Sequence, residues 1–100
     1  MDSTQATSNG KTRIVVTTLG ADRSGIVAAV ATKLAENDAN ILEISQAILD
    51  GIFTMSMIVE LDEGKTSFKK LSEELTSLND KLGVQVQAQR EDVFKFMYRI

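Results

Sequence analysis

The sequence predicts an α+β fold of the ferredoxin-like type, a βαββαβ sandwich followed by a short C-terminal helix. Four segments are rich in β-branched or alternating apolar residues, and two of the segments between them carry apolar residues at helical spacing. The dipeptide Asp50-Gly51 joins the second and third strands as a hairpin. Right-handed crossovers place the first and third strands in the middle of the sheet, with both helices on one face.

The first strand is the β-branched run 14–19, which is apolar on both faces and is therefore expected to be central. Residues 1–12 are rich in Ser, Thr, Gln and Asn and are expected to form a flexible N-terminal tail, which leaves 13–100 as one domain. Asp22 or Ser24 is expected to cap the first helix, and an Asn within 37–40 to end it in the left-handed conformation. Its apolar stripe is Ile26, Val27, Val30, Ala31 and Leu34.

The second strand, 41–49, is expected to alternate between two faces. One face carries Leu42, Ile44, Gln46 and Ile48, and the other carries Glu43, Ser45, Ala47 and Leu49. Asp50 and Gly51 should both have positive φ, as a type I′ turn requires. The third strand then presents one apolar face that begins with Phe53.

The second helix is expected to begin after a cap at Thr66 or Ser67 and to end at Gly83. Its apolar face is Phe68, Leu71, Leu75, Leu78 and Leu82. In the fourth strand Val84, Val86 and Ala88 alternate with three glutamines. A terminal helix that opens at Glu91 carries apolar side chains that cannot all face one side, so we expect either core closure or contact with a partner: Phe94, Phe96, Met97, Tyr98 and Ile100.

Composition excludes several classes of function. The net charge of −3 and scattered basic residues argue against nucleic-acid binding. The chain has no Cys and no His, which excludes thiolate chemistry and removes the commonest general base and transition-metal ligand, so no metal or cofactor is expected. There is no apolar run long enough for a transmembrane helix and no apolar segment typical of a secretory signal, so a cytoplasmic location is expected.

The loop after the first strand is the best candidate for a binding site. Backbone N–H groups at the start of the first helix favour an anionic group such as an α-carboxylate, and Gly25 permits close approach of a ligand. Asp22 could pair with an α-ammonium group. The loop is not a P-loop, because Ile26 and Val27 follow Gly25 in place of Lys-Ser/Thr. The alternative is that Asp22 and Ser24 are ordinary caps and that Arg23 is solvated.

These residues resemble the ACT domain family, and more narrowly the short stand-alone ACT proteins related to the glycine-cleavage repressor. The likeness covers about 13–100 and rests on Gly20-x-Asp22-Arg23-Ser24-Gly25-Ile26-Val27, Asn40-Ile41 and the ending Phe94-x-x-Met97-Tyr98-x-Ile100. The resemblance implies a homodimer that binds an amino acid between the loop and the start of the second strand, often that of the partner subunit. By position it implies Gly20, Ala21, Asp22, Arg23, Ser24 and Gly25, with Asn40, Ile41 and Leu42 opposite.

The second strand also predicts dimerisation independently, because Glu43 is its only charged residue before the turn and a weakly protected edge invites pairing with a second chain. Two-fold pairing there would extend the sheet to about eight strands. The alternative is that the N-terminal tail or the terminal helix covers this edge.

Three functions remain open. The first is a non-catalytic regulatory module that senses an amino acid and acts on a separate protein in trans. The second is a protein-interaction module without a small ligand. The third is a small enzyme that uses Asp22, Glu43 or Glu60 as a base, which would require two carboxylates to be buried beside Arg23.

Overall fold

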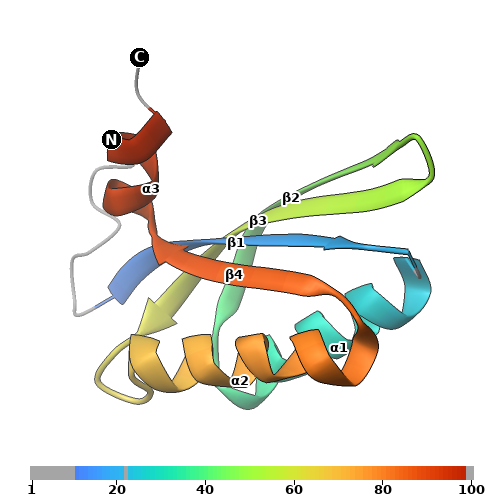
Figure 1. Ribbon diagram of the computed structural model, residues 1–100. Helices are drawn as coiled ribbons and strands as arrows, with labels where there is room; N and C mark the ends of the chain where they lie inside the picture. Colours follow the sequence, from blue (N-terminus) through green and yellow to red (C-terminus); the bar gives the residue numbers. More distant parts are fainter. Residues whose placement is uncertain (1–10, 22, 99–100) are drawn as a thin grey trace.

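The computed structural model describes residues 11–21 and 23–98, and it confirms the predicted fold. The strands form one antiparallel sheet in the order β2-β3-β1-β4, with β1 and β3 in the middle as predicted. Helices α1 and α2 cover one face of the sheet, and α3 rises from the opposite side at the end of β4 (Figure 1). The elements are β1 (Lys11–Gly20), α1 (Arg23–Glu36), β2 (Asn40–Leu49), β3 (Ile52–Asp62), α2 (Phe68–Leu82), β4 (Gln85–Arg90) and α3 (Glu91–Tyr98).

β1 begins earlier than the sequence predicts. The strand starts at Lys11, two residues inside the stretch assigned to the tail, because Lys11 and Thr12 continue the pairing with β3. Residues 1–10, the rest of the predicted tail, lie outside the described residues. Val15 is buried although it faces away from the helices, which fits the prediction of a strand that is apolar on both faces.

The core lies between the sheet and the two helices. Both helices contribute residues at the predicted spacing, and β3 contributes its whole apolar face from Phe53 onward. Burial of each large aliphatic side chain stabilises the fold by about 1.5–3 kcal/mol. The prediction for Leu82 is wrong: the residue was expected on the buried face of α2, but its side chain is 44% exposed. The buried residues of α1 and α2 are Ile26, Val30, Leu34, Leu71, Leu75 and Leu78.

Four of the predicted turn and cap residues are confirmed. Asp50 and Gly51 have φ values of 53° and 82°, as the type I′ hairpin requires. Ser67 accepts a hydrogen bond of 3.0 Å from the Lys70 backbone N–H, and Gly83 ends α2 with φ of 65°. The prediction for the end of α1 is wrong, because the left-handed residue there is Asp38, with φ of 56°, and not an asparagine.

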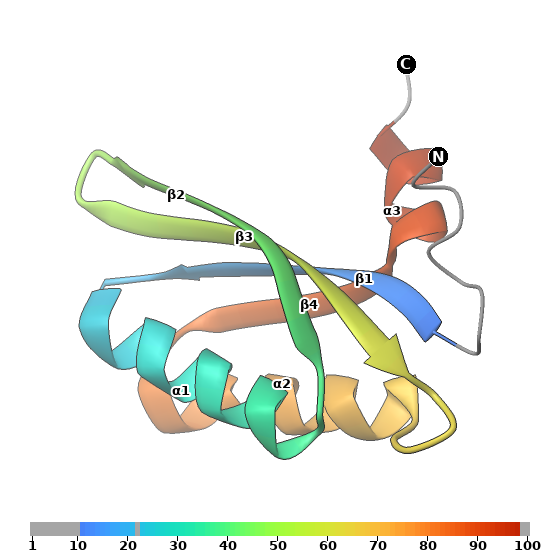
Figure 2. The same ribbon diagram turned by 180° about the vertical axis from the view of Figure 1, so that it is seen from behind.

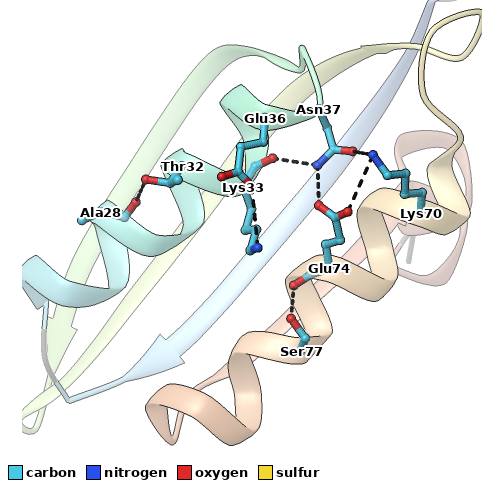
Figure 3. A network of polar contacts seen from close by, with 8 residues as sticks. All are labelled: Ala28, Thr32, Lys33, Glu36, Asn37, Lys70, Glu74 and Ser77. Atoms are coloured by element: carbon cyan, nitrogen blue, oxygen red, sulfur yellow. Dashed lines mark hydrogen bonds and ion pairs between the residues drawn. The ribbon is translucent and has the colours of Figure 1, made fainter.

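Asn37 instead joins the end of α1 to α2 (Figure 3). It is 1% exposed, and its Nδ2 donates to the Lys33 carbonyl and to Glu74 Oε1, both at 2.8 Å. Its Oδ1 accepts from Lys70 Nζ at 3.4 Å. The hydrogen bond from Asn37 is the main cause that lowers the pKa of Glu74. The buried amide is therefore satisfied within the fold and has a structural role.

A second polar cluster ties down the end of the sheet nearest α3. Arg90 Nη1 donates to Glu63 Oε2 at 2.6 Å, and Thr12 Oγ1 donates to the same oxygen at 2.7 Å. The Arg90 guanidinium also lies 4.8 Å from the centroid of the Phe68 ring. The hydrogen bonds from Arg90 and Thr12 lower the pKa of Glu63 to about 2. Arg13 pairs with Glu91 at 3.1 Å, which fixes the first turn of α3 against β1.

Candidate functional site

The predicted binding loop lies where β1 passes into α1. Gly20 ends the strand, and a Cβ there would stand 2.4 Å from Ile26 Cδ1 and 2.8 Å from Val84 Cγ1. A glycine is therefore required so that the first turn of α1 can pack closely on the sheet. Ala21 and Ser24 are exposed and Gly25 is half-buried, whereas Asp22 lies outside the described residues.

A depression of about 390 Å³ lies between the first turns of α1 and strand β2. This volume is within the range of small-molecule sites. Among the described side chains, Ser24 is the one predicted site residue that lines it, together with Val27, Ala28 and Gln46; the side chains of Asp22 and Arg23 lie outside the description. Sequence reasoning did not select Gln46. The sequence feature that could have indicated Gln46 is its amide, which stands on a face of the second strand that otherwise carries Leu and Ile.

The second half of the predicted site lies at the other end of the sheet. Gly20 opposes Phe53 on β3, whereas Asn40 opposes Glu60 on the same strand. Positions 53 and 60 are seven residues apart, which is about 23 Å along a strand. The loop from Gly20 to Gly25 and the segment from Asn40 to Leu42 are therefore separated within one chain.

β2 departs from the predicted alternation at its start. Ile41 opposes Val59 and Glu43 opposes Ile58, so Leu42 is the extra residue of a β-bulge. The bulge places both Ile41 and Ile44 on the side of the helices, which a strict period of two does not allow. Leu42 is therefore wrongly assigned by the sequence, whereas the two faces predicted from Glu43 to Leu49 are confirmed by the register.

β2 is an exposed edge strand along almost all of its length. Ile44 is 46% exposed and Ile48 and Leu49 are each 64% exposed, although all three are large aliphatic residues. The hairpin of β2 and β3 reaches beyond the helix layer (Figures 1 and 2), so α1 and α2 do not cover these side chains. Among the described residues, α3 does not lie along this edge (Figure 2), whereas residues 1–10 of the predicted tail lie outside the described part of the chain.

Of the three acidic residues proposed for catalysis, Glu43 and Glu60 lie away from the loop, and Asp22 lies outside the described residues. Glu43 is exposed on β2, and Glu60 is half-buried at the far end of β3, where it pairs with Lys11 at 4.0 Å. No group of three or more acidic side chains that could hold a metal ion is present among the described residues. Of the helices in residues 11–21 and 23–98, none is long and apolar enough to cross a membrane.

Buried Thr18 is a further feature that the sequence did not single out. Its side chain lies on the helix side of β1, two residues before Gly20, and is 1% exposed. Its Oγ1 has no hydrogen-bond partner among the described residues. A buried hydroxyl without a partner costs about 1–3 kcal/mol of stability, so a valine would suit this position better on packing grounds alone.

Comparison with known proteins identifies relatives over nearly the whole domain. A UPF0237 protein of Methanocaldococcus jannaschii is 51% identical over 88 residues, which are 88% of this chain and 98% of the relative. A UPF0237 protein of Listeria innocua is 41% identical over 88 residues, with 88% and 99% covered.

Two solved structures are similar in fold and sequence. An ACT domain protein from Streptococcus pneumoniae has a TM-score of 0.73 and 40% identity, covering 87% of this chain and 98% of that protein. A structure described as a putative glycine cleavage system transcriptional repressor has a TM-score of 0.67 and 25% identity, covering 80% of this chain and 46% of its own.

The family model of the ACT domain matches residues 12–89, from the start of β1 to the end of β4. This match contains the loop, both helices of the core layer and the exposed edge strand. The chain belongs to the ACT domain family, a family of regulatory ligand-binding modules.

Proposed function

We propose that this protein is a homodimer that senses a small amino acid and regulates a separate protein in trans, without catalysing a reaction itself. The observation that carries the proposal is the separation of the two halves of the predicted site. In one chain the loop from Gly20 to Gly25 and the start of β2 lie at opposite ends of the sheet. A second copy supplies the missing half.

Antiparallel pairing of two β2 strands brings these halves to the same end. The loop lies beside the hairpin end of β2, and a two-fold axis across the edge places the start of the partner's β2 at that end. The same pairing covers Ile44 and Ile48, which are exposed in the single chain. It also removes an unprotected sheet edge and extends the four-stranded sheet.

The chemistry of the depression fits a zwitterionic ligand. The first-turn N–H groups of α1 and the positive end of its dipole would hold a carboxylate, and the Asp22 carboxylate would complement an ammonium group. The described lining is uncharged, with Ser24, Val27, Ala28 and the Gln46 amide. Such a lining favours a small ligand side chain without charge.

A thermal-shift screen of the twenty amino acids, run with light scattering, tests the proposal. A ligand that binds only the native state at a hundredfold excess over its Kd raises the unfolding free energy by about 2.7 kcal/mol. We expect a dimer, a shift with one or a few small amino acids, and loss of that shift in Gly25→Val. Lys69→Ala, at an exposed position on α2, is the matched control and should keep the shift.

A protein-interaction module without a small ligand is the second candidate. The exposed aliphatic residues of the hairpin favour it, because depletion of charge and enrichment of apolar side chains are typical of interface centres. A stable dimer that shows no shift with any amino acid would support this function in place of the first.

A further inference from the structure

We propose that the two β2 strands pair in one particular register, with the two-fold axis at Gln46, so that the partner's Gln46 completes the wall of each ligand depression. The inference rests on the proposed dimer and names the residue at its centre. Three independent features of β2 lead to it: the length of its regular segment, the direction of its backbone groups and the matching of its side chains.

The regular segment of β2 is bounded on both sides. The bulge at Leu42 interrupts the strand before Glu43, and the hairpin turn begins directly after Leu49. The stretch from Glu43 to Leu49 has Gln46 as its midpoint. A register centred on Gln46 pairs this whole stretch with its copy. If the centre were Ser45, Ile48 would lie opposite the partner's bulge. If the centre were Ala47, Ile44 would lie opposite the partner's turn.

The backbone groups of β2 point outward at the right residues. Leu49 and Ile52 flank a two-residue turn, so they form a hydrogen-bonded pair, and the pattern alternates along the hairpin from there. The odd-numbered residues from Glu43 to Leu49 therefore bond to β3. The backbone N–H and C=O groups of Ile44, Gln46 and Ile48 therefore point to the open edge of the sheet. A second strand that lies along this edge can form hydrogen bonds with them.

The side chains match in this register. Ile44 opposes the partner's Ile48 on the helix side, and this pairing occurs twice by symmetry. Ser45 opposes the partner's Ala47 on the other side, so two small side chains meet and no like charges face each other. Gln46 opposes the partner's Gln46, and two amides can exchange hydrogen bonds because each carries donors and an acceptor.

The consequence concerns the ligand site. Gln46 lines the depression beside Ser24, Val27 and Ala28 in each chain. Because the two-fold axis passes between the two Gln46 side chains, the depressions of the two subunits lie next to each other. Only the two Gln46 amides separate them. The partner's Gln46 then faces the ligand space of the first subunit, so each site is incomplete without the second copy.

Single cysteine variants of the full chain test the register, because the natural sequence has no cysteine. Ser45 and Ala47 are both exposed, so Ser45→Cys and Ala47→Cys should fold. In the proposed register residue 45 lies opposite residue 47 of the partner in a non-hydrogen-bonded pair, with a Cα separation of about 4.5 Å that a disulfide can bridge. Residue 45 lies diagonally from its own copy at about 8 Å, which is too far.

The two variants carry tags of different size and are oxidised with copper–phenanthroline, separately and after refolding as a mixture. We expect a disulfide-linked species that contains both tags in the mixture and no linked species from either variant alone. Linkage of Ser45→Cys alone would move the axis to Ser45, and linkage of Ala47→Cys alone would move it to Ala47; either result overturns the register.

Light scattering on the same samples separates this inference from the proposed function. A dimer that gives no linkage in any sample would mean that the copies meet through another surface, which overturns the register but not dimerisation. A monomer would overturn both. Reduction with dithiothreitol, which should restore the unlinked chains, confirms that any linked species is a disulfide.

Discussion

The two ends of the sheet differ in how they are stabilised. At the α3 end, Arg90, Glu63 and Thr12 share short hydrogen bonds, and Arg13 pairs with Glu91 across β1 and α3. At the hairpin end, the described side chains include four exposed aliphatic residues in place of such hydrogen bonds and ion pairs: Leu19, Ile48, Leu49 and Ile52. The first end is complete within one chain, whereas the second exposes apolar surface that a second copy can cover. We therefore expect substitutions at the first end to change the stability of the fold, and substitutions at the second end to change the proposed assembly.

Loss of the Glu63 carboxylate should have the largest effect on stability. Glu63→Gln removes the charged acceptor of Arg90 and Thr12, and we expect a loss of about 2 kcal/mol in the unfolding free energy at pH 7. Urea unfolding followed by circular dichroism measures it. Glu73→Gln, at an exposed position of α2, is the control and should change stability little.

The pH dependence sharpens this prediction. The folded pKa of Glu63, about 2, lies below its ordinary value of 4.5. The unfolded chain therefore binds the proton more readily, so the stabilisation is complete above pH 4.5 and is lost as the pH falls toward 2. The Glu63→Gln variant should lose less stability than the natural protein over this interval. An identical decline in both proteins would contradict the role assigned to this carboxylate.

Gly20→Ala should come next, because its Cβ meets Ile26 and Val84 at distances that require the helix or these side chains to move. We expect a loss of about 1–1.5 kcal/mol, at the low end of the usual cost of overpacking, because the atoms that must move belong to side chains. Gly64→Ala is the matched control, since its nearest neighbour within reach is the flexible end of the Asp62 side chain at 3.1 Å. Equal thermal stability of the two variants would refute the packing argument for Gly20.

Thr18→Val should change stability in the opposite direction. The substitution keeps the shape of the side chain and removes a buried hydroxyl without a partner, so we expect a gain of up to about 1 kcal/mol. The Tm measures it, with Thr17→Val on the other face of β1 as the comparison. A clear loss of stability in Thr18→Val would mean that the hydroxyl is satisfied in solution.

Ile48→Lys should have the smallest effect on the protomer and a specific effect on assembly. The side chain is 64% exposed, so the unfolding free energy of the protomer should change by less than about 0.5 kcal/mol. The dimer should weaken, because two lysines replace two apolar contacts at the edge. Leu82→Lys, which is also exposed but lies on α2, should leave the dimer intact in light scattering.

Local signals made most of the fold predictable from the sequence. Strand alternation, the Asp50-Gly51 turn and the Ser67 and Gly83 caps depend on neighbouring residues, and the structure has them as expected. The bulge at Leu42 was not predictable, because an extra residue in a strand is set by pairing with β3 and by packing. The role of Asn37 depends on Glu74, which is distant in sequence.

The candidate site was predictable only in part for the same reason. The loop at Gly20 is a local feature, and its position beside α1 is as expected. Gln46 is brought to Ser24 by the crossover from β1 through α1 to β2, which local patterns do not reveal. The separation of Asn40 from the loop is likewise a property of the strand register.

The central claim is that each binding site combines the loop of one subunit with the β2 start of the other. Mixing two defective variants tests it by calorimetric titration with the amino acid found in the screen. Gly25→Val damages the loop, and Leu42→Glu places a negative charge at the start of β2. Each variant alone should remain dimeric and bind nothing, whereas refolding them together should restore binding, because half of the sites in mixed dimers carry neither change. A mixture that binds no ligand while mixed dimers form would contradict the account.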